Sequence, residues 1–310
     1  MSNLSARLLV AAVAIPVIVL LAWLGGYFWL FFVGAVLVAA MHEFSDFART
    51  KGAAPQTALM TAAGLALLLA FMHERLGADI AALSGGTLPY PLQWQAVLWI
   101  VLLFVIVAPL IELFRNRGSA LMNTAMSFLG FFYIGLCLAT VVGIREIFSV
   151  AEFPVGRVFG TAVLNAAQAA QLSAWGGATI IALLATIWIC DTAAYVGGRT
   201  MGKHKLFERV SPKKTWEGAV WGFLGAIGAM AGAKYLALEY LPLHHALVIG
   251  AFVGSLGQIG DLVESLFKRD AGVKDSSALL PGHGGVFDRF DSLIFVSPVV
   301  FLYLDFIVFA

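Results

Sequence analysis

Long apolar segments, separated by short polar ones, run along almost the whole chain of 310 residues. A helix that crosses a lipid bilayer needs about 20 mostly apolar residues, and stretches of nearly that length recur throughout the sequence. Nine segments fit this pattern: 8–24, 27–42, 56–72, 94–113, 120–142, 175–197, 216–237, 245–262 and 290–309. The pattern predicts an all-α polytopic membrane protein with about nine transmembrane helices.

The composition agrees with this fold class. The chain is 61% hydrophobic and 12% charged, whereas an average soluble domain carries about 25% charged residues. The net charge of +1 gives no reason to expect nucleic acid or another polyanion as a partner. Cys137 and Cys190 lie in apolar segments, which favours two small buried side chains over a disulfide or a metal site. Arg7 precedes the first apolar segment, which we interpret as a retained helix rather than a cleaved signal peptide.

The spans divide the chain into two regions. Residues 1–174 would hold about five spans and the outer loops, and residues 175–310 would hold about four spans and the polar loops. Gly25 and Gly26 separate the first two spans, which predicts a tight helical hairpin. Glycines spaced by three and four share one face of the seventh span and allow close approach of a neighbouring helix. They are Gly218, Gly222, Gly225, Gly228 and Gly232.

The lysines and arginines indicate which loops share a side of the membrane. With nine crossings, Arg75, Arg145, Arg157 and Lys234 lie on one side, and the other 15 of the 19 cations lie on the side of the N-terminus. Cytoplasmic loops carry an excess of Lys and Arg. The N-terminus is therefore predicted to be cytoplasmic.

The most highly charged part of the chain runs from residue 257 to residue 291, between two apolar segments. Charged side chains beside hydrocarbon are costly, so a dense group of them indicates a functional site. The group contains six carboxylates and four cations: Asp261, Glu264, Asp270, Asp275, Asp288, Asp291, Lys268, Arg269, Lys274 and Arg289.

Part of this group shares one helical face, because positions i, i+3, i+4 and i+7 of a helix are neighbours. The residues at these positions are Asp261, Glu264, Ser265 and Lys268. Asp261 precedes the last polar turn by about 10 Å along the helix. It is therefore expected near the hydrocarbon edge, at the depth of a lipid phosphate.

Asp288 and Asp291 begin the last span, three positions apart. Two helix ends could thus direct carboxylates towards one point. Hard oxygen ligands without Cys or a His pair suit Mg²⁺, which binds one or two carboxylates together with phosphate oxygens and water. The alternative is a set of helix-end ion pairs, for example Asp288 with Arg269.

His283 lies in a turn that reads Pro281-Gly-His-Gly-Gly285. Glycines allow tight turns and close ligand approach, and successive amides in such a turn can bind an anion. Two interpretations stay open: His283 contacts a phosphate or donates a proton, or it is a structural hydrogen-bonding residue.

A second polar stretch joins spans six and seven. Asp191, Tyr195 and Arg199 share one face at the end of span six, and Ser211 and Pro212 are expected as the N-cap and first residue of the next helix. A helix N-terminus can bind an anion, and nearby lysines could neutralise a triphosphate. The alternative is a basic loop that only sets topology, but Asp191 in an apolar span argues against it. The further polar residues are Lys203, Lys205, Lys213, Lys214, Thr215 and Glu217.

Glu43, Asp46 and Arg49 lie three positions apart at the end of span two. This spacing puts them on one helical face on the same side as the charged stretches. We interpret them as a solvated helix end.

At this point the residues resemble a known family, the phosphatidate cytidylyltransferases or CDP-diacylglycerol synthases. The resemblance rests first on Ser265-x-x-Lys268-Arg269-x4-Lys274-Asp275-x5-Pro281-Gly-His283-Gly-Gly285-x-x-Asp288-Arg289-x-Asp291. A second block comprises Asp191-Thr-x-Ala-Tyr195, Gly198-Arg199, Gly202-Lys203-x-Lys205-Leu206 and Ser211-Pro-Lys-Lys-Thr-x-Glu-Gly218. Ala193 stands where the family is expected to have glycine. The two blocks cover about the last 120 residues, and residues 1–170 resemble the family only in being apolar spans.

The resemblance implies an enzyme that joins CTP and phosphatidic acid to give CDP-diacylglycerol and pyrophosphate. It implies Mg²⁺ at Asp261 and Asp288, with a monovalent cation such as K⁺ near the same centre. It also implies a homodimer in the bacterial inner membrane with its active site on the cytoplasmic side. The candidate catalytic residues are Asp261, Asp288, Lys268 and His283. The candidate substrate-binding residues are Asp191, Arg199, Lys203, Lys205, Ser211, Lys213, Lys214, Thr215, Glu217, Ser265, Arg269, Lys274, Asp275, Arg289 and Asp291.

Two other functions fit part of the pattern. A polyprenol or dolichol kinase-like enzyme would use similar metal–phosphate chemistry with a lipid alcohol as the acceptor. An ion-coupled transporter could use Asp191 and Asp261 as a cation pathway, but transporters tend to have repeats and midplane sites. Here the charge gathers at one face of the membrane.

Overall fold

Nearly every described segment of the protein is helical, as the hydrophobic pattern predicts. The computed structural model describes residues 3–86, 92–149, 153–160, 163–277 and 284–310. The first half contains α1 (Asn3–Leu24), α2 (Gly26–Thr50), α3 (Thr57–Ala70), α4 (His73–Ser84), α5 (Gln93–Phe114), α6 (Ala120–Gly130), η1 (Phe131–Leu136), α7 (Cys137–Glu146) and α8 (Val155–Phe159). The second half contains α9 (Ala166–Met201), β1 (Lys205–Phe207), β2 (Ser211–Thr215), α10 (Trp216–Leu236), α11 (Leu243–Phe252), η2 (Val253–Gly257), α12 (Gln258–Asp270), α13 (Phe287–Tyr303) and η3 (Leu304–Val308). The η segments are π-helical turns that continue neighbouring α-helices.

The helices confirm an integral membrane protein of the predicted class. Each of the nine predicted spans overlaps a helix. Within the described residues, seven helices are long and apolar enough to cross a membrane, and an eighth crossing results if α3 and α4, bent by 80°, count as one. Helix α1 contributes a shorter apolar stretch, Val10–Leu24. The count of nine and the orientation of the N-terminus stay predictions.

Helix α9 begins earlier than its apolar pattern indicates. It starts at Ala166, inside the region that we expected to end at residue 174. The side chain of Asn165 accepts a hydrogen bond from the Gln168 amide at 2.9 Å, and the Gln168 side chain accepts from the Asn165 amide at 3.0 Å. This reciprocal cap satisfies two amides that the first turn of a helix leaves unpaired. A local polar signal therefore sets the start of α9.

The segment after α9 differs from the predicted helix start. The prediction that Ser211 caps a helix with Pro212 at its first position is wrong, because both residues lie in strand β2. Strand β2 pairs antiparallel with β1 in a two-stranded hairpin, where an edge position tolerates the missing amide of proline. Helix α10 begins at Trp216, and Oγ1 of Thr215 accepts a hydrogen bond from the Gly218 amide at 3.2 Å. Thr215 is the actual N-cap.

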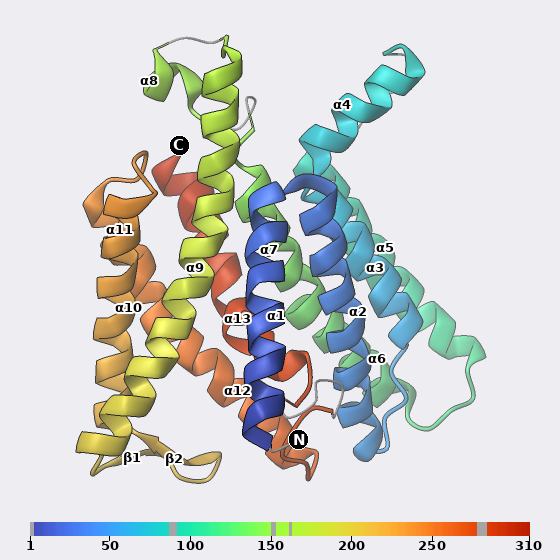
Figure 1. The fold of residues 1–310 in the computed structure, drawn as a ribbon. Coiled ribbons are helices and arrows are strands. Elements are labelled where there is room, and N and C mark those ends of the chain that lie inside the picture. The colour runs from blue at the N-terminus through green and yellow to red at the C-terminus, as the bar shows by residue number, and fades with distance from the viewer. Residues whose placement is uncertain (1–2, 87–91, 150–152, 161–162, 278–283) are drawn as a thin grey trace.

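The polar segments gather at one end of the helix bundle (Figure 1). The hairpin, the N-terminus and the loop into α13 lie at that end, and α4, α8 and the C-terminus lie at the other. The cations assigned to the outer side belong to elements at this second end: Arg75 in α4, Arg145 in the last turn of α7, Arg157 in α8 and Lys234 in the last turn of α10. The termini at opposite ends agree with an odd number of crossings.

The predicted helical hairpin at Gly25 and Gly26 is confirmed. Both glycines have a positive φ, 64° and 53°, which other residues rarely adopt. The buried guanidinium of Arg145 packs against Gly25 and donates from Nε to the Ala22 carbonyl at 3.1 Å. Arg145 thereby satisfies a carbonyl that the end of α1 leaves unpaired.

The glycine face of α10 packs as predicted along only part of its length. A Cβ atom on Gly218, Gly222 or Gly225 would lie 2.7 to 3.0 Å from atoms of α9. Among the described residues, nothing lies within 4 Å of a Cβ built on Gly228 or Gly232. Helices α9 and α10 are close beside the hairpin and diverge towards the other end (Figure 1). The close approach therefore occurs where the polar residues are.

Cysteine labelling in intact cells tests the orientation. Single cysteines at Arg209, in the hairpin, and at Leu83, which is 89% exposed on α4, would be introduced after replacing the free thiols Cys137 and Cys190. An impermeant maleimide should label the Leu83 variant in intact cells, and the Arg209 variant only after lysis. Labelling in the reverse order would contradict the predicted topology.

Candidate active site

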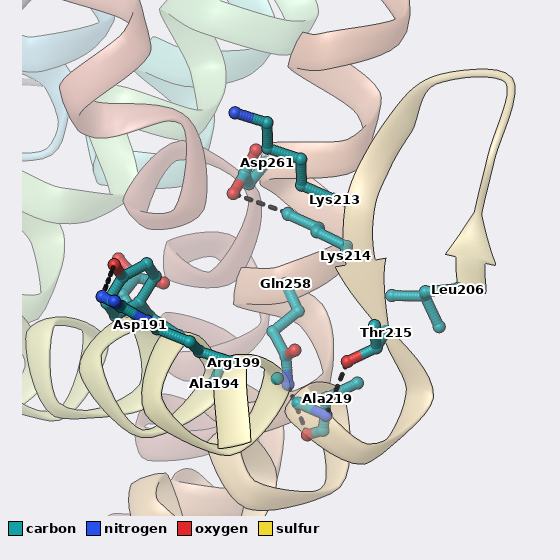
Figure 2. A pocket seen from close by; sticks show the side chains of 13 residues that line it. Asp191, Ala194, Arg199, Leu206, Lys213, Lys214, Thr215, Ala219, Gln258 and Asp261 are labelled. Carbon is teal, nitrogen blue, oxygen red and sulfur yellow. Dashed lines mark hydrogen bonds and ion pairs between the residues drawn. The ribbon is translucent and has the colours of Figure 1, made fainter. Parts of the chain in front are cut away.

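A cavity of about 450 Å³ opens between α9, the hairpin, α10 and α12. Side chains from these elements converge on it (Figure 2). Its polar lining comprises Asp191, Tyr195, Arg199, Lys213, Lys214, Thr215, Gln258 and Asp261. The two polar stretches of the sequence therefore meet in one site.

An ion pair between Lys214 and Asp261 joins the two stretches. Lys214 Nζ lies 2.6 Å from Asp261 Oδ2, and the two side chains are 27% and 36% exposed. At this exposure, solvent screening limits the contribution of the pair to stability to about 1 kcal/mol. Electrostatic interactions extend from the pair to Asp191 on α9 and to Asp291 on α13. The carboxylates of three helices therefore interact electrostatically with one another and with Lys214.

The helix that carries Asp261 is irregular directly before it. The π-helical turn η2 ends at Gly257, and such a turn adds a residue to the helical repeat and rotates the residues that follow. The next residue, Gln258, donates from Nε2 to the Ala219 carbonyl of α10 at 3.0 Å. One turn beyond Asp261, the Ser265 hydroxyl donates to Asp261 Oδ1 at 3.3 Å. The first contact holds the start of α12 against α10, and the second orients the Asp261 carboxylate along α12.

A second charged group lies where α12 meets α13. Lys268 Nζ is 2.6 Å from Glu264 Oε2 and 2.8 Å from Asp288 Oδ1, and the Glu264 side chain is 0% exposed. The other oxygen of Asp288 accepts from the amides of Ser276 and Gly285, at 3.0 and 2.9 Å. Asp288 therefore holds both sides of the loop between the two helices.

Glu43 also holds this loop, so its interpretation as part of a solvated helix end is wrong. The side chain is buried. It accepts hydrogen bonds from the hydroxyls of Ser276 and Ser277, at 2.7 and 2.6 Å, and from the amides of Val286 and Phe287, at 2.9 and 2.8 Å. A residue of α2 therefore binds the segment that precedes α13.

A separate apolar groove of about 580 Å³ lies between α1, α2, α9 and α13. Among the described residues that line it, which include Ala14, Ala35 and Phe290, Arg289 is the one charged side chain. Arg289 interacts electrostatically with Asp191, which lines the polar cavity. The groove and the cavity therefore approach each other at the start of α13.

The sequence of the chain matches a protein family. The model of the cytidylyltransferase family matches residues 5–307, almost the whole chain. The chain belongs to the cytidylyltransferase family.

Two relatives of this family member match nearly its full length, and a third matches part of it. A protein of Synechocystis sp. named phosphatidate cytidylyltransferase is 31% identical over 302 residues, which cover 96% of this chain and 95% of the relative. A protein of Brucella suis with the same name is 31% identical over 307 residues, covering 98% and 94%. One from Staphylococcus saprophyticus is 47% identical over 114 residues, covering 37% and 44%.

The predicted site residues fall into three groups. The cavity is lined by Asp191, Arg199, Lys213, Lys214, Thr215 and Asp261. The Ser265 hydroxyl donates to Asp261, and Asp291 interacts electrostatically with Asp261. Lys268 pairs with Asp288, and Arg289 lines the groove. The remaining candidates outside the cavity lining are Lys203, Lys205, Ser211, Glu217, Arg269, Lys274 and Asp275, while His283 lies outside the described residues.

Some of the remaining candidates have clear structural contacts. Glu217 accepts from the amide of Lys203 at 3.0 Å and lies 2.6 Å from Nδ1 of His204, so it holds the turn before β1. Arg269 donates to the Val210 carbonyl at 3.3 Å and so connects α12 to the hairpin. These two residues shape the walls of the site.

Two polar residues of this family member were missed as site residues, Gln258 and Glu43. Each is a polar residue inside or at the end of an apolar run, the same signal that selected Asp191. Their partners, Ala219 for Gln258 and the residues around Val286 for Glu43, are distant in the sequence. A polar residue in an apolar run could therefore have identified both as candidates, but only the fold shows which groups they bind.

The donor set suits a hard cation such as Mg²⁺. The carboxylates of Asp191, Asp261 and Asp291 interact electrostatically with one another. Carboxylate oxygens are the ligands that Mg²⁺ prefers. Within the described residues, no three His, Cys, Asp or Glu side chains are already arranged around a common metal position. Both oxygens of Asp288 accept hydrogen bonds or pair with Lys268. Metal binding by Asp261 and Asp288 remains a prediction.

Replacing Lys268 should destabilise the folded protein. The Lys268→Met substitution leaves Glu264 buried beside Asp288 without its cation, and breaking a buried ion pair in this way costs about 3 to 5 kcal/mol. The free energy of unfolding in detergent should fall accordingly. In the double variant Lys268→Met/Glu264→Gln, part of the loss should be recovered.

Lys274→Met is the matched control, because Lys274 is exposed on the loop. Its effect should stay within about 0.5 kcal/mol. Equal unfolding free energies for Lys268→Met and Lys274→Met would show that the Lys268 group contributes nothing to stability.

Proposed function

We propose that this protein transfers the cytidylyl group of CTP to phosphatidic acid, giving CDP-diacylglycerol and pyrophosphate. Membership of the cytidylyltransferase family supports this reaction, as do full-length relatives named phosphatidate cytidylyltransferase. The observation that carries the proposal is the polar cavity beside an apolar groove, with Arg289 and Asp191 at their junction. A water-soluble nucleotide and a membrane lipid could meet there.

The cavity has the charges that a nucleoside triphosphate requires. Arg199, Lys213 and Lys214 line it. Cationic side chains of this kind attract phosphate groups. In the proposed complex, these groups hold the phosphates of CTP.

The groove has the properties that an acyl chain requires. Its walls are apolar side chains of α1, α2, α9 and α13, and Arg289 is the one charged side chain among its described lining residues. A diacyl phosphate lipid would place its chains along these walls and its phosphate near Arg289. Arg289 then orients the lipid phosphate towards the cavity.

The reaction needs no covalent enzyme intermediate. An oxygen of the lipid phosphate forms a bond to the α-phosphorus of CTP, and the bond from that phosphorus to the bridging oxygen breaks. The electron pair of that bond leaves with pyrophosphate. The cations of the cavity offset negative charge on the phosphates, so catalysis depends on positioning and electrostatics.

We propose Mg²⁺ as the cofactor, held by Asp261 with support from the neighbouring carboxylates. When bound, it would neutralise charge on phosphate oxygens. In this proposal, Lys214 gives up its pairing with Asp261 and binds a phosphate of CTP. Asp288 as a second ligand, a nearby monovalent cation and the homodimer remain predictions that come from the family resemblance.

We also propose that the active site faces the cytoplasm. CTP is available on that side, and the excess of lysine and arginine lies at the end of the bundle that holds the cavity. In a bacterial cell this corresponds to the inner face of the inner membrane.

An assay with purified protein tests the reaction. Labelled CTP, phosphatidic acid and Mg²⁺ should give CDP-diacylglycerol and one pyrophosphate per product. The Asp261→Asn variant should lose at least about 100-fold in kcat, because the carboxylate proposed to hold Mg²⁺ at the reacting phosphates is neutralised. Asp46→Asn, on an exposed pair with Arg49, is the control and should keep normal activity.

Each other outcome has a defined meaning. Release of CDP with a phosphorylated lipid alcohol would favour the polyprenol or dolichol kinase-like alternative. An active wild-type enzyme with an equally active Asp261→Asn variant would remove Asp261 from the mechanism. No product from folded wild-type protein would contradict the proposed function.

Filling the groove should weaken lipid use selectively. Ala35→Trp places a large side chain in the groove and should raise KM for phosphatidic acid about tenfold, while KM for CTP changes less than twofold. Leu113→Trp, at a position 76% exposed on α5, is the control for an added tryptophan. An unchanged KM for phosphatidic acid in Ala35→Trp would exclude the groove as the acyl site.

A further inference from the structure

Glu43 is a buried carboxylate whose bonding is complete without a cation. It is 5% exposed and, within the described part of the chain, forms no ion pair with Lys or Arg. A buried carboxylate is costly unless its oxygens accept hydrogen bonds. A carboxylate has about four acceptor sites, and four donors meet it here, two serine hydroxyls and two backbone amides. Such complete bonding fixes the donors as firmly as it fixes Glu43.

The two amides belong to the start of α13. Val286 and Phe287 lie at the N-terminus of this helix, where amides have no partner within the helix. A negative charge at this end is also favoured by the helix dipole. The preceding amide, that of Gly285, donates to Asp288. Consecutive amides are therefore held by two carboxylates, one from the helix itself and one from α2.

The same two carboxylates hold the other side of the loop. Glu43 accepts from the Ser276 hydroxyl at 2.7 Å, and Asp288 accepts from the Ser276 amide at 3.0 Å. Asp288 in turn lies 2.8 Å from Lys268. If the Glu43 carboxylate moved, Ser276 and the start of α13 would move with it, and Asp288 and Lys268 would be displaced.

The glycines before α13 allow these carboxylates to approach the backbone. A Cβ on Gly285 would lie 2.5 Å from Glu43 Oε2. Gly284 has a φ of +79°, and a Cβ there would lie 2.6 Å from Asp288 Oδ2. The Gly285 amide of this turn thus binds the protein's own Asp288, where the sequence suggested an anion from outside.

We propose that Glu43 is a positioning residue for cytidylyl transfer. It holds the loop before α13, so that Asp288 stays paired with Lys268 and the first turn of α13 keeps its place between the groove and the cavity. Because this is a role in catalysis, it rests on the function proposed above. Glu43 does not line the polar cavity. Its loss should therefore affect kcat and leave CTP binding nearly unchanged.

The Glu43→Gln variant tests this role. It keeps the size of the side chain but replaces one acceptor oxygen with an NH₂ group that faces donors. We expect kcat to fall between about tenfold and 100-fold, as expected for a small misplacement of a catalytic group, with KM for CTP within twofold of wild type. Hydrogen exchange of the peptide over residues 284–290 should become faster, which reports on the loop without reference to activity.

A second variant reaches the same contact from the other side. Gly285→Ala places a methyl group against both the Ser276 hydroxyl and the Glu43 carboxylate that accepts from it, and should reproduce the fall in kcat. Gly228→Ala is its control, because a Cβ there meets nothing within 4 Å among the described residues. Asp46→Asn is the control on α2, since Asp46 is exposed and pairs only with Arg49 in the described structure.

The outcomes separate this role from the proposed function. An inactive but folded wild type contradicts the function, whereas an active wild type with a fully active Glu43→Gln variant contradicts the positioning role. A rise in KM for CTP equal to the fall in kcat would also overturn it, because Glu43 would then shape the nucleotide cavity. If Glu43→Gln does not fold, the Gly285→Ala result decides, and normal kcat there rejects the role.

Discussion

Lys268 holds its charge between two carboxylates, Glu264 of its own helix and Asp288 of α13. At the end of an apolar bundle, any one of these charges alone would be strongly unfavourable, and only the group as a whole is tolerated. The pairing therefore requires α12 and α13 to meet here. It also requires the loop between them to fold back, so that its amides reach the second oxygen of Asp288.

The first turn of α13 distributes three charges among three environments. Asp288 faces the Lys268 group, Arg289 lines the apolar groove, and Asp291 interacts with the carboxylates of the polar cavity. A helix turns by about 100° per residue, so Arg289 points away from Asp288, whereas Asp291 lies about 60° from Asp288 around the helix. This short segment lets one helix contact the nucleotide side and the lipid side of the proposed reaction.

The N-terminal half has a specific connection to this chemistry. Glu43 of α2 is separated from Val286 and Phe287 by almost the whole chain, yet it accepts hydrogen bonds from both amides. Hairpin contacts complete the opposite wall, where Glu217 and Arg269 bind backbone groups around the strands. The active-site loops are thus held by polar contacts from helices that first appear to be only membrane anchors.

Much of this protein follows from local patterns. The apolar segments identified the helices, because lipid requires each backbone polar group to be paired within a helix. The spacing of Asp261, Ser265, Glu264 and Lys268 correctly predicted shared helical contacts, since these depend only on helical geometry. The predictions that Ser211 caps a helix and that Glu43 is solvated were wrong because they depend on more than local geometry. Whether a proline-containing segment becomes a strand, or a carboxylate at a helix end meets water, depends on partners distant in the chain. Those partners, including the amides that surround Glu43 and the pairing of Asp261 with Lys214, exist only once the helices pack together.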